Sequence, residues 1–264
     1  MTNFSSHAIL VLILFSRQIN SMNNLTRRQT QILKTIIDEY IETAEPVGSD
    51  TLDKKYNLGI SPATIRNEMV SLTKAGYLNQ PHTSAGRTPT PLALKLYVSE
   101  IMKPNDLSVA DEVKVKQKIW DYRSQMDKSL REATKALAEH TKTMSLAATD
   151  EGNLFTSGLG YILDMPEFYD IDITKHLLDT LDEYDFWWQI FGRFDKENIL
   201  PEVLLGADLG RTNLNECGGV FVRFSTPTHK GAIGVVGPTR LNYPRIIPIV
   251  RYIGDLINEV SSGW

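Results

Sequence analysis

The chain has 264 residues, of which 42% are hydrophobic and 23% charged, and these values fit a globular protein large enough for two domains. Its formal net charge is -4 and its pI is about 5.8, whereas affinity for DNA depends on neutralising phosphates. The total charge therefore argues mildly against a nucleic-acid partner unless cations gather on one face. The single cysteine, Cys217, excludes an internal disulfide, and we expect a small buried residue in a reducing compartment.

The first 22 residues form an N-terminal extension with an apolar run at residues 8–15. This run is far shorter than the ~20 residues that span a bilayer, no Lys or Arg precedes it, and no small-residue cleavage site follows it. We therefore expect no export and a cytoplasmic location. Two interpretations stay open: Met22 is the true start of the protein, or residues 1–22 form a disordered or loosely docked tail.

Three helices are predicted between residues 26 and 76. Thr26 and Gln29 have the spacing of a capping box, and apolar residues then recur at helical spacing, which predicts a first helix at about 26–43. Residues 46–49 break this helix, and Ser49 can cap a short second helix. Residues 57–60 then form the turn into a third helix.

The third helix has both ends marked and an outward face that suits DNA. Ser61 can cap it, Pro62 suits the first helical position, and Gly76 can supply the left-handed residue at its end. Small residues at the start of a helix allow close approach to the major groove, where Arg and Asn can make paired hydrogen bonds to base edges. The predicted apolar face holds Ile65, Met69 and Leu72, and the residues that point elsewhere are Ala63, Thr64, Arg66, Asn67 and Lys74.

A β-ribbon is predicted next, with strands at residues 77–80 and 88–90 and an exposed tip at 82–87. Arg87 would meet a phosphate or enter a minor groove. His82 is either a satisfied histidine of the ribbon or a phosphate contact. Glu68 is expected either to pair with a neighbouring cation or to cap locally, and not to contact a base. The predicted DNA-binding residues are Ser49, Ser61, Ala63, Thr64, Arg66, Asn67, His82, Thr83, Ser84 and Arg87.

Two sets of segments resemble the sequence signatures of one bacterial family. Residues 46–49, 61–69 and 80–87 are similar to its DNA-binding signature, and residues 166–168 and 231–240 with Tyr243 are similar to its carboxy-terminal signature. On these residues the chain resembles the HrcA family of heat-inducible transcription repressors. The resemblance implies a winged-helix domain followed by a GAF-like domain, a homodimer, an inverted-repeat operator upstream of chaperone genes, and activity supported by the GroEL chaperonin.

The chain departs from the family pattern between the long helix expected after the DNA-binding domain and residues 166–168. Family members usually carry several strands of the GAF-like sheet and an inserted dimerisation module there. In this chain residues 147–152 are followed almost directly by residues 159–163, which leaves no room for those elements. Leu241 and Asn242 also stand where the family more often has Met and Asp, which weakens any role carried over to that turn. The second domain is therefore expected to be trimmed.

The remaining elements complete an α+β fold. A short helix at residues 92–101 precedes a break at 104–106, and residues 109–148 contain no Pro or Gly, which indicates one long helix or a helical hairpin. This helical region either packs within its domain or pairs with a second protomer. Further predictions are helices within 173–194, a strand at 203–206, a strand pair at 219–224 and 231–236, and a last helix at 243–260. The predicted domains are a winged-helix domain at 23–103, a helical linker or dimerisation helix at 104–150, and a trimmed GAF-like regulatory domain at 151–264.

Catalysis has little support in the sequence. The five histidines are scattered, and there is no H-E-x-x-H metal motif, P-loop or nucleophile elbow, so we predict no enzyme, cofactor or metal. Trp187 and Trp188 fit a core or interface, and residues 237–240 fit a structural turn better than an anion site. The leading hypothesis is a dimeric repressor. The alternatives are a GAF-like small-molecule sensor that regulates non-chaperone genes and, last, a protein-interaction adaptor.

Overall fold

The structure is a computed structural model that describes residues 25–82, 85–121, 125–194, 200–227 and 229–261. It combines helices with two antiparallel sheets, so the predicted α+β class is confirmed. The chain divides into two compact units, with residues up to Glu39 and Glu45–Ala93 in the first and Tyr40–Ala44 and Leu94–Trp264 in the second. The sequence placed this boundary about ten residues later, at the break before residue 104.

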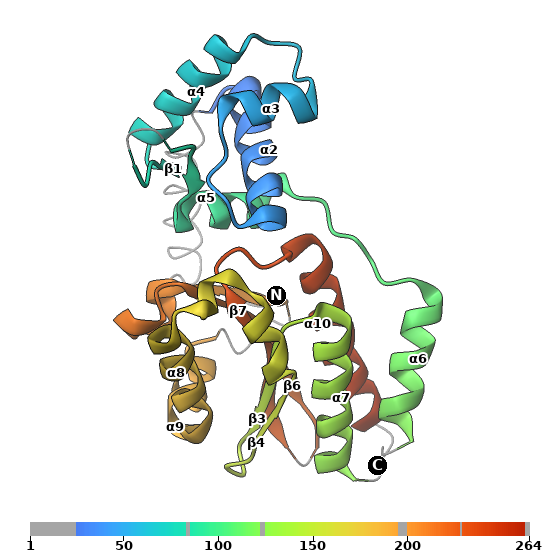
Figure 1. The fold of residues 1–264 in the computed structure, drawn as a ribbon. Helices are drawn as coiled ribbons and strands as arrows, with labels where there is room; N and C mark the ends of the chain where they lie inside the picture. The colour runs from blue at the N-terminus through green and yellow to red at the C-terminus, as the bar shows by residue number, and fades with distance from the viewer. Residues whose placement is uncertain (1–24, 83–84, 122–124, 195–199, 228, 262–264) are drawn as a thin grey trace, which may run out of the picture. The chain divides into compact units, whose positions relative to one another are not determined.

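Among the described residues, the first unit contains three helices that share a core, the start of a fourth helix, and a small β-ribbon (Figure 1). Ile36, Leu52, Ile65 and Leu72 are fully buried, so one face of each helix packs into a common core. β1 pairs with β2 in an antiparallel ribbon, and Val47 forms an isolated bridge to Arg87 beside it. The elements are α2 (Arg27–Thr43), whose last four residues belong to the second unit, α3 (Ser49–Tyr56), α4 (Pro62–Lys74), β1 (Leu78–Asn79), β2 (Thr88–Pro89) and the start of α5 (Pro91–Leu96), which continues past Ala93 into the second unit.

The predicted helix ends are confirmed at three positions. The backbone N–H of Thr26 donates to Gln29 Oε1 at 3.0 Å and that of Gln29 donates to Thr26 Oγ1 at 3.2 Å, which completes the capping box. Ser61 Oγ accepts from the backbone N–H of Thr64 at 3.2 Å, and Gly76 has a φ of +83° in the left-handed region. Both ends of α4 are therefore fixed by local chemistry.

The predicted cap of α3 is wrong by one residue. Gly48 is the N-cap, with φ -92° and ψ 156°, and Ser49 is the first helical residue with its side chain buried. The cause lies in the preceding residue: Val47 pairs with Arg87 through two backbone hydrogen bonds of 2.8 and 2.9 Å, which keeps the chain extended up to Gly48. The helix can begin only after that bridge.

A buried carboxylate ties α2 to α3. Glu39 accepts hydrogen bonds from Lys55 Nζ at 2.7 Å and from Tyr56 Oη at 2.5 Å. These bonds stabilise the charged form, so the hydrogen bonds from Lys55 and then Tyr56 lower the pKa of Glu39. The first two helices are thus held at their ends by polar contacts as well as by the core.

The second unit is built on a five-stranded antiparallel sheet with strand order β4-β3-β7-β6-β5. β7 pairs with both β3 and β6, and Gly234 lies opposite Leu146 on one side and Phe221 on the other. Cys217 begins β6 and is buried, as predicted, which raises the pKa of its thiol to about 12. The strands are β3 (Met144–Thr149), β4 (Leu154–Ser157), β5 (Glu202–Leu205), β6 (Cys217–Ser225) and β7 (Lys230–Pro238).

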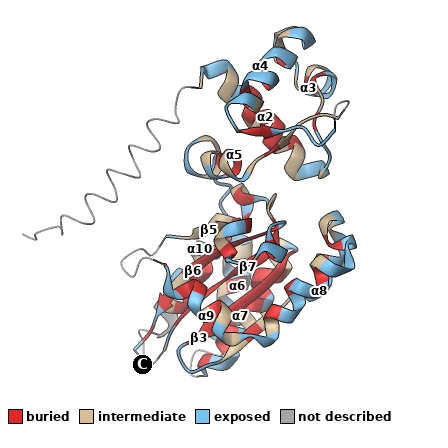
Figure 2. Cartoon of the chain, turned by 90° about the vertical axis from the view of Figure 1, so that its left-hand side faces the viewer, coloured by how far each residue is buried: buried red, intermediate tan, exposed pale blue. Residues whose placement is uncertain are grey.

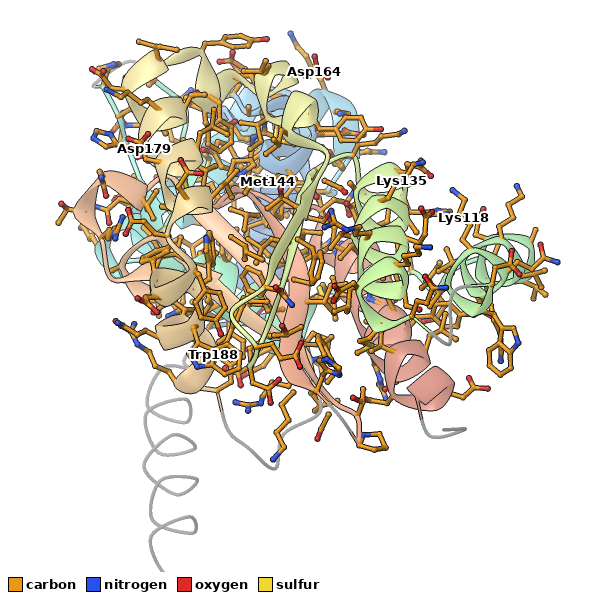
Figure 3. The ribbon with its side chains drawn as sticks, turned by 90° about the horizontal axis from the view of Figure 1, so that it is seen from below. Lys118, Lys135, Met144, Asp164, Asp179 and Trp188 are labelled. Atoms are coloured by element: carbon orange, nitrogen blue, oxygen red, sulfur yellow. The ribbon has the colours of Figure 1, made fainter. Side chains whose placement is uncertain are left out.

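Helices cover both faces of this sheet. Figure 3 shows α6 and α7, marked by Lys118 and Lys135, on one side of Met144 in β3, with α8 and α9, marked by Asp179 and Trp188, on the other. α10 packs with α7 on the first side. The described helices are a π-helical turn (Tyr97–Ile101), α6 (Val109–Trp120), α7 (Met126–Thr141), α8 (Ile171–Asp179), α9 (Tyr184–Gly192) and α10 (Tyr243–Ser261). Short 3-10 turns lie at Leu159–Asp164, Pro166–Tyr169, Thr180–Asp182, Gly206–Leu209 and Thr212–Leu214.

An aromatic core fills the space between the sheet and α9. Trp187 is fully buried, its ring centroid lies 5.9 Å from that of Phe221 in β6, and its Nε1 donates to the backbone oxygen of Thr180 at 3.0 Å. Phe191 lies 5.1 Å from Phe221. Trp187 is therefore a core residue, whereas Trp188 is partly buried and stacks on Tyr184 at 5.8 Å.

The predicted helical region at 109–148 is a hairpin that ends earlier than expected. α6 packs against α7, and α7 stops at Lys142, which adopts a left-handed φ of 56°. Residues 144–149 are an extended central strand, β3, and the following β4 was not predicted. The stretch that appeared too short for further sheet strands thus contains a β-hairpin, and the predicted linker at 104–150 is part of the second unit.

Candidate nucleic-acid interface

The first unit presents an exposed polar face along α4. Ile65, Met69 and Leu72 are buried, as predicted, so the opposite side of the helix faces solvent (Figure 2). An exposed Arg beside an exposed Asn on one helix face can bind guanine and adenine edges through bidentate hydrogen bonds. We call the exposed residues the outer face of α4, namely Ala63, Arg66, Asn67, Val70, Ser71 and Lys74.

Arg66 borders α3 at one edge of this face. Its Nη2 lies 3.5 Å from Ser49 Oγ, and Ser49 is only 7% exposed. Ser49 therefore supports Arg66 from within the unit and is not on the surface where a direct DNA contact was expected. Ser61 is exposed, but its hydroxyl caps α4 and lies 2.9 Å from Thr64 Oγ1, so both hydroxyls have local partners.

Glu68 lies at the other edge of the outer face and contacts the first turn of α2. Gln29 Nε2 donates to Glu68 Oε2 at 3.0 Å, and Arg28 Nη1 lies 3.6 Å from Glu68 Oε1. The predicted pairing of Glu68 with a neighbouring cation is confirmed. The contact between Arg28 and Glu68 could not be predicted from the sequence pattern, because residues 40 positions apart leave no local signal.

Arg87 joins the ribbon to α4. Its Nε donates to Thr73 Oγ1 at 3.2 Å, and its Nη1 donates to the backbone oxygen of Ala85 at 3.3 Å. Its backbone N–H and C=O bridge Val47, and Gly86 permits this approach because a Cβ there would lie 2.5 Å from the Val47 carbonyl. A phosphate contact by Arg87 would be made alongside or in place of these bonds.

The tip of the ribbon is only partly described. His82 is exposed, and its backbone oxygen accepts from the N–H of Ala85 at 2.9 Å, which closes a turn. Thr83 and Ser84, two of the predicted DNA-binding residues, lie outside the described residues. The outer face of α4 thus brings together Ala63, Arg66 and Asn67 from the predicted set, and the ribbon adds His82.

In the second unit, an ion pair links the two carboxy-terminal segments that the sequence singled out. Arg240 Nε and Nη2 donate to the two oxygens of Glu167 at 2.5 and 3.0 Å, and the side chains are only 13% and 15% exposed. Tyr243 is buried and its hydroxyl donates to the backbone oxygen of Thr239, while burial raises the pKa of Tyr243. These contacts support the structural-turn interpretation of residues 237–240.

Two further kinds of site are absent from the described part of the chain. The described residues contain no group of three or more His, Cys, Asp or Glu side chains that could hold a metal ion. Nor do they contain a helix that is both long and apolar enough to cross a membrane.

Comparisons with known proteins identify the family. The model of the HrcA protein C-terminal domain matches residues 99–247. The heat-inducible transcription repressor HrcA of Clostridium acetobutylicum is 46% identical over 336 aligned positions, which cover 89% of this chain and 97% of that protein. The corresponding repressor of Ruminiclostridium cellulolyticum is 25% identical, with 89% and 97% covered.

A solved structure shares the fold. The crystal structure of a hypothetical protein at 2.2 Å resolution has a TM-score of 0.71 and 18% sequence identity, and the match covers 91% of this chain and 99% of that one. The HrcA model alone matches more than half of the chain, and the repressors match nearly all of it. The chain therefore belongs to the HrcA family of heat-inducible transcription repressors.

Proposed function

We propose that the first unit is a winged helix-turn-helix domain in which α3 and α4 form the helix-turn-helix and β1 and β2 form the wing. The observation that carries this proposal is the exposed outer face of α4, which presents Arg66 and Asn67 beside the small residue Ala63. A helix of this kind enters the major groove with its first turns close to the bases. Ala63, Thr64, Arg66 and Asn67 then read sequence, while Ser49, Ser61, His82, Thr83, Ser84 and Arg87 support the helix or contact the backbone.

The repressor occupies an inverted-repeat operator upstream of chaperone genes and blocks polymerase. Membership of the HrcA family supports this function over the alternative of a small-molecule sensor. Binding to the chromosome places the protein in the cytoplasm. The second unit, with a five-stranded sheet covered by helices on both faces, serves as a trimmed GAF-like regulatory domain, and the GroEL chaperonin is its proposed partner.

Genome-wide footprinting with the purified protein tests this function. The expected result is a small set of protected sites that share one inverted repeat and lie upstream of chaperone genes. Non-specific coating of DNA, with no shared motif, would overturn the proposal. Footprints upstream of unrelated genes, together with a metabolite that co-purifies with the protein, would favour the sensor.

The protein is expected to be a homodimer, because two linked half-site contacts gain affinity through effective concentration. The exposed stripe of α6 is the proposed interface: Val109, Val113 and Trp120 are 76%, 50% and 38% exposed and recur at helical spacing. Light scattering at micromolar concentration should give the dimer mass. Val113→Glu should shift the protein toward monomer, whereas Lys114→Glu, on the adjacent exposed position, should not. A wild-type monomer that binds the repeat without cooperativity would contradict the dimer.

Arg87 is expected to act through the placement of the wing. Thr73→Val removes the hydroxyl that accepts from Arg87 Nε and should weaken operator binding about as much as Arg87→Ala does, while the double variant should be no weaker than either alone. Binding isotherms of the four proteins complete the cycle. Arg87→Lys keeps the positive charge but loses the planar guanidinium with its several N–H donors, so it should not restore the affinity for the operator. If the losses of binding free energy in the two single variants add up in the double variant, or if Thr73→Val binds the operator as tightly as the wild type, Arg87 makes an independent phosphate contact.

A further inference from the structure

The outer face of α4 has a carboxylate on one flank. Successive residues of an α-helix are turned by about 100° around its axis, so Arg66 and Glu68 lie on opposite sides of Asn67. A helix is about 10–12 Å across with its side chains and the major groove is about 12 Å wide. Both flanks of a helix in that groove therefore face sugar-phosphate backbone. An uncompensated Glu68 would repel the strand on its side.

The structure supplies the compensation from the first turn of α2. Gln29 Nε2 donates to one oxygen of Glu68 at 3.0 Å, and Arg28 Nη1 lies 3.6 Å from the other. Gln29 is itself held by the capping box with Thr26. Glu68 is mostly covered, with 19% of its side chain exposed, whereas the side chain of Arg28 is 56% exposed. The carboxylate is thus screened and the cation faces solvent.

We infer that Arg28 binds a DNA phosphate on the flank of α4 opposite Arg66, with Glu68 holding the guanidinium beside the groove. An arginine has five N–H donors in a planar fork, so a single contact to Glu68 leaves donors for a phosphate oxygen. The inference rests on the proposed entry of α4 into the major groove. It adds a phosphate contact from α2, a helix that contributes none of the predicted DNA-binding residues.

Salt dependence tests this assignment because each neutralised phosphate contributes about 0.9 to the slope of log affinity against log salt. Arg28→Ala should reduce the slope by about one, on the operator and on random duplex DNA alike. Arg28→Lys should retain most of the slope. The matched control is Lys34→Ala, which removes a cation six residues further along α2, where Lys34 pairs with Asp38, and should leave the slope unchanged.

The outcomes separate the inference from the proposed function. An Arg28→Ala protein with the wild-type slope would overturn the inference, and so would a loss confined to the operator. If Arg28→Ala does not fold, as judged by circular dichroism, Arg28→Gln gives the same measurement with a neutral side chain of similar reach. A wild-type protein that fails to bind any inverted repeat would overturn the proposed function as well. A wild-type protein that binds, and is weakened by Arg66→Ala but not by Arg28→Ala, would overturn the inference alone.

Discussion

Arg66→Ala and Asn67→Ala are each expected to lose operator discrimination while the protein remains folded. Both side chains are exposed on the outer face of α4, so their removal leaves the buried contacts of Ile65, Met69 and Leu72 intact. A bidentate contact to a base edge contributes about 1–3 kcal/mol of discrimination, which corresponds to roughly a 5- to 150-fold change in the ratio of operator to random DNA affinity.

Competition binding against random duplex DNA measures this ratio directly. Each variant should bind random DNA nearly as well as the wild type does, apart from the lost charge at Arg66, because sequence is read by base contacts and not by the backbone. Lys54→Ala, at an exposed position on α3 outside the outer face, is the control and should keep the ratio. Wild-type discrimination in both variants would show that α4 is not the element that reads the operator.

Local chemistry made the ends of α2 and α4 predictable. The capping box of Thr26 and Gln29, the cap at Ser61 and the left-handed Gly76 all depend on residues within four positions of one another. The outer face of α4 followed from the same local information, because the positions of Ile65, Met69 and Leu72 fix which side is buried. For these elements the sequence pattern alone determined both the structure and the candidate surface.

Contacts between distant segments were not predictable in the same way. The Ser49 cap failed because Val47 pairs with Arg87, and the hydrogen bond from Arg87 to Thr73 was not predicted. Neither partner leaves a periodic pattern. The backbone pairing of Val47 with Arg87, and the close approach of Gly86 to Val47, depend on the tertiary fold that brings residues 46–47 beside the β-ribbon.

The strand β3 shows how tertiary pairing can override helix propensity. Its sequence includes Met144, Leu146, Ala147 and Ala148, residue types that favour helices in isolation. All six residues of the strand are buried because it lies between β4 and β7 in the sheet. In this position packing on both faces decides the conformation, and alternation of polar and apolar residues is absent.

The chain is shorter than the relative that it matches over almost the whole length of that protein. The alignment with the Clostridium acetobutylicum repressor covers 336 positions, more than the 264 residues of this chain, so the relative carries segments without a counterpart here. The β3–β4 hairpin nevertheless provides the edge of a five-stranded sheet. The second unit therefore has a continuous core, with Trp187 and Phe221 packed inside it.

The largest expected effect on stability comes from breaking the ion pair between Glu167 and Arg240. Arg240 donates to both oxygens of Glu167, and both side chains are mostly buried. Removing one partner of a buried pair leaves an uncompensated charge, which costs about 3–5 kcal/mol. Glu167→Ala should therefore destabilise the second unit by about that amount in urea unfolding. The fluorescence of tryptophan reports this unit, because all four tryptophans follow residue 119.

Two controls distinguish the buried charge from a general effect of substitution. Glu183→Ala removes an exposed partner of Arg211, at 2.9 Å, and should leave the unfolding midpoint nearly unchanged because water screens that pair. Replacing both Glu167 and Arg240 with Met removes the unpaired charge and should recover much of the stability lost in Glu167→Ala. A Glu167→Ala midpoint equal to that of the wild type would contradict the argument. It would mean that water reaches Arg240 once the carboxylate is gone, and that the two carboxy-terminal segments are joined by packing and not by charge.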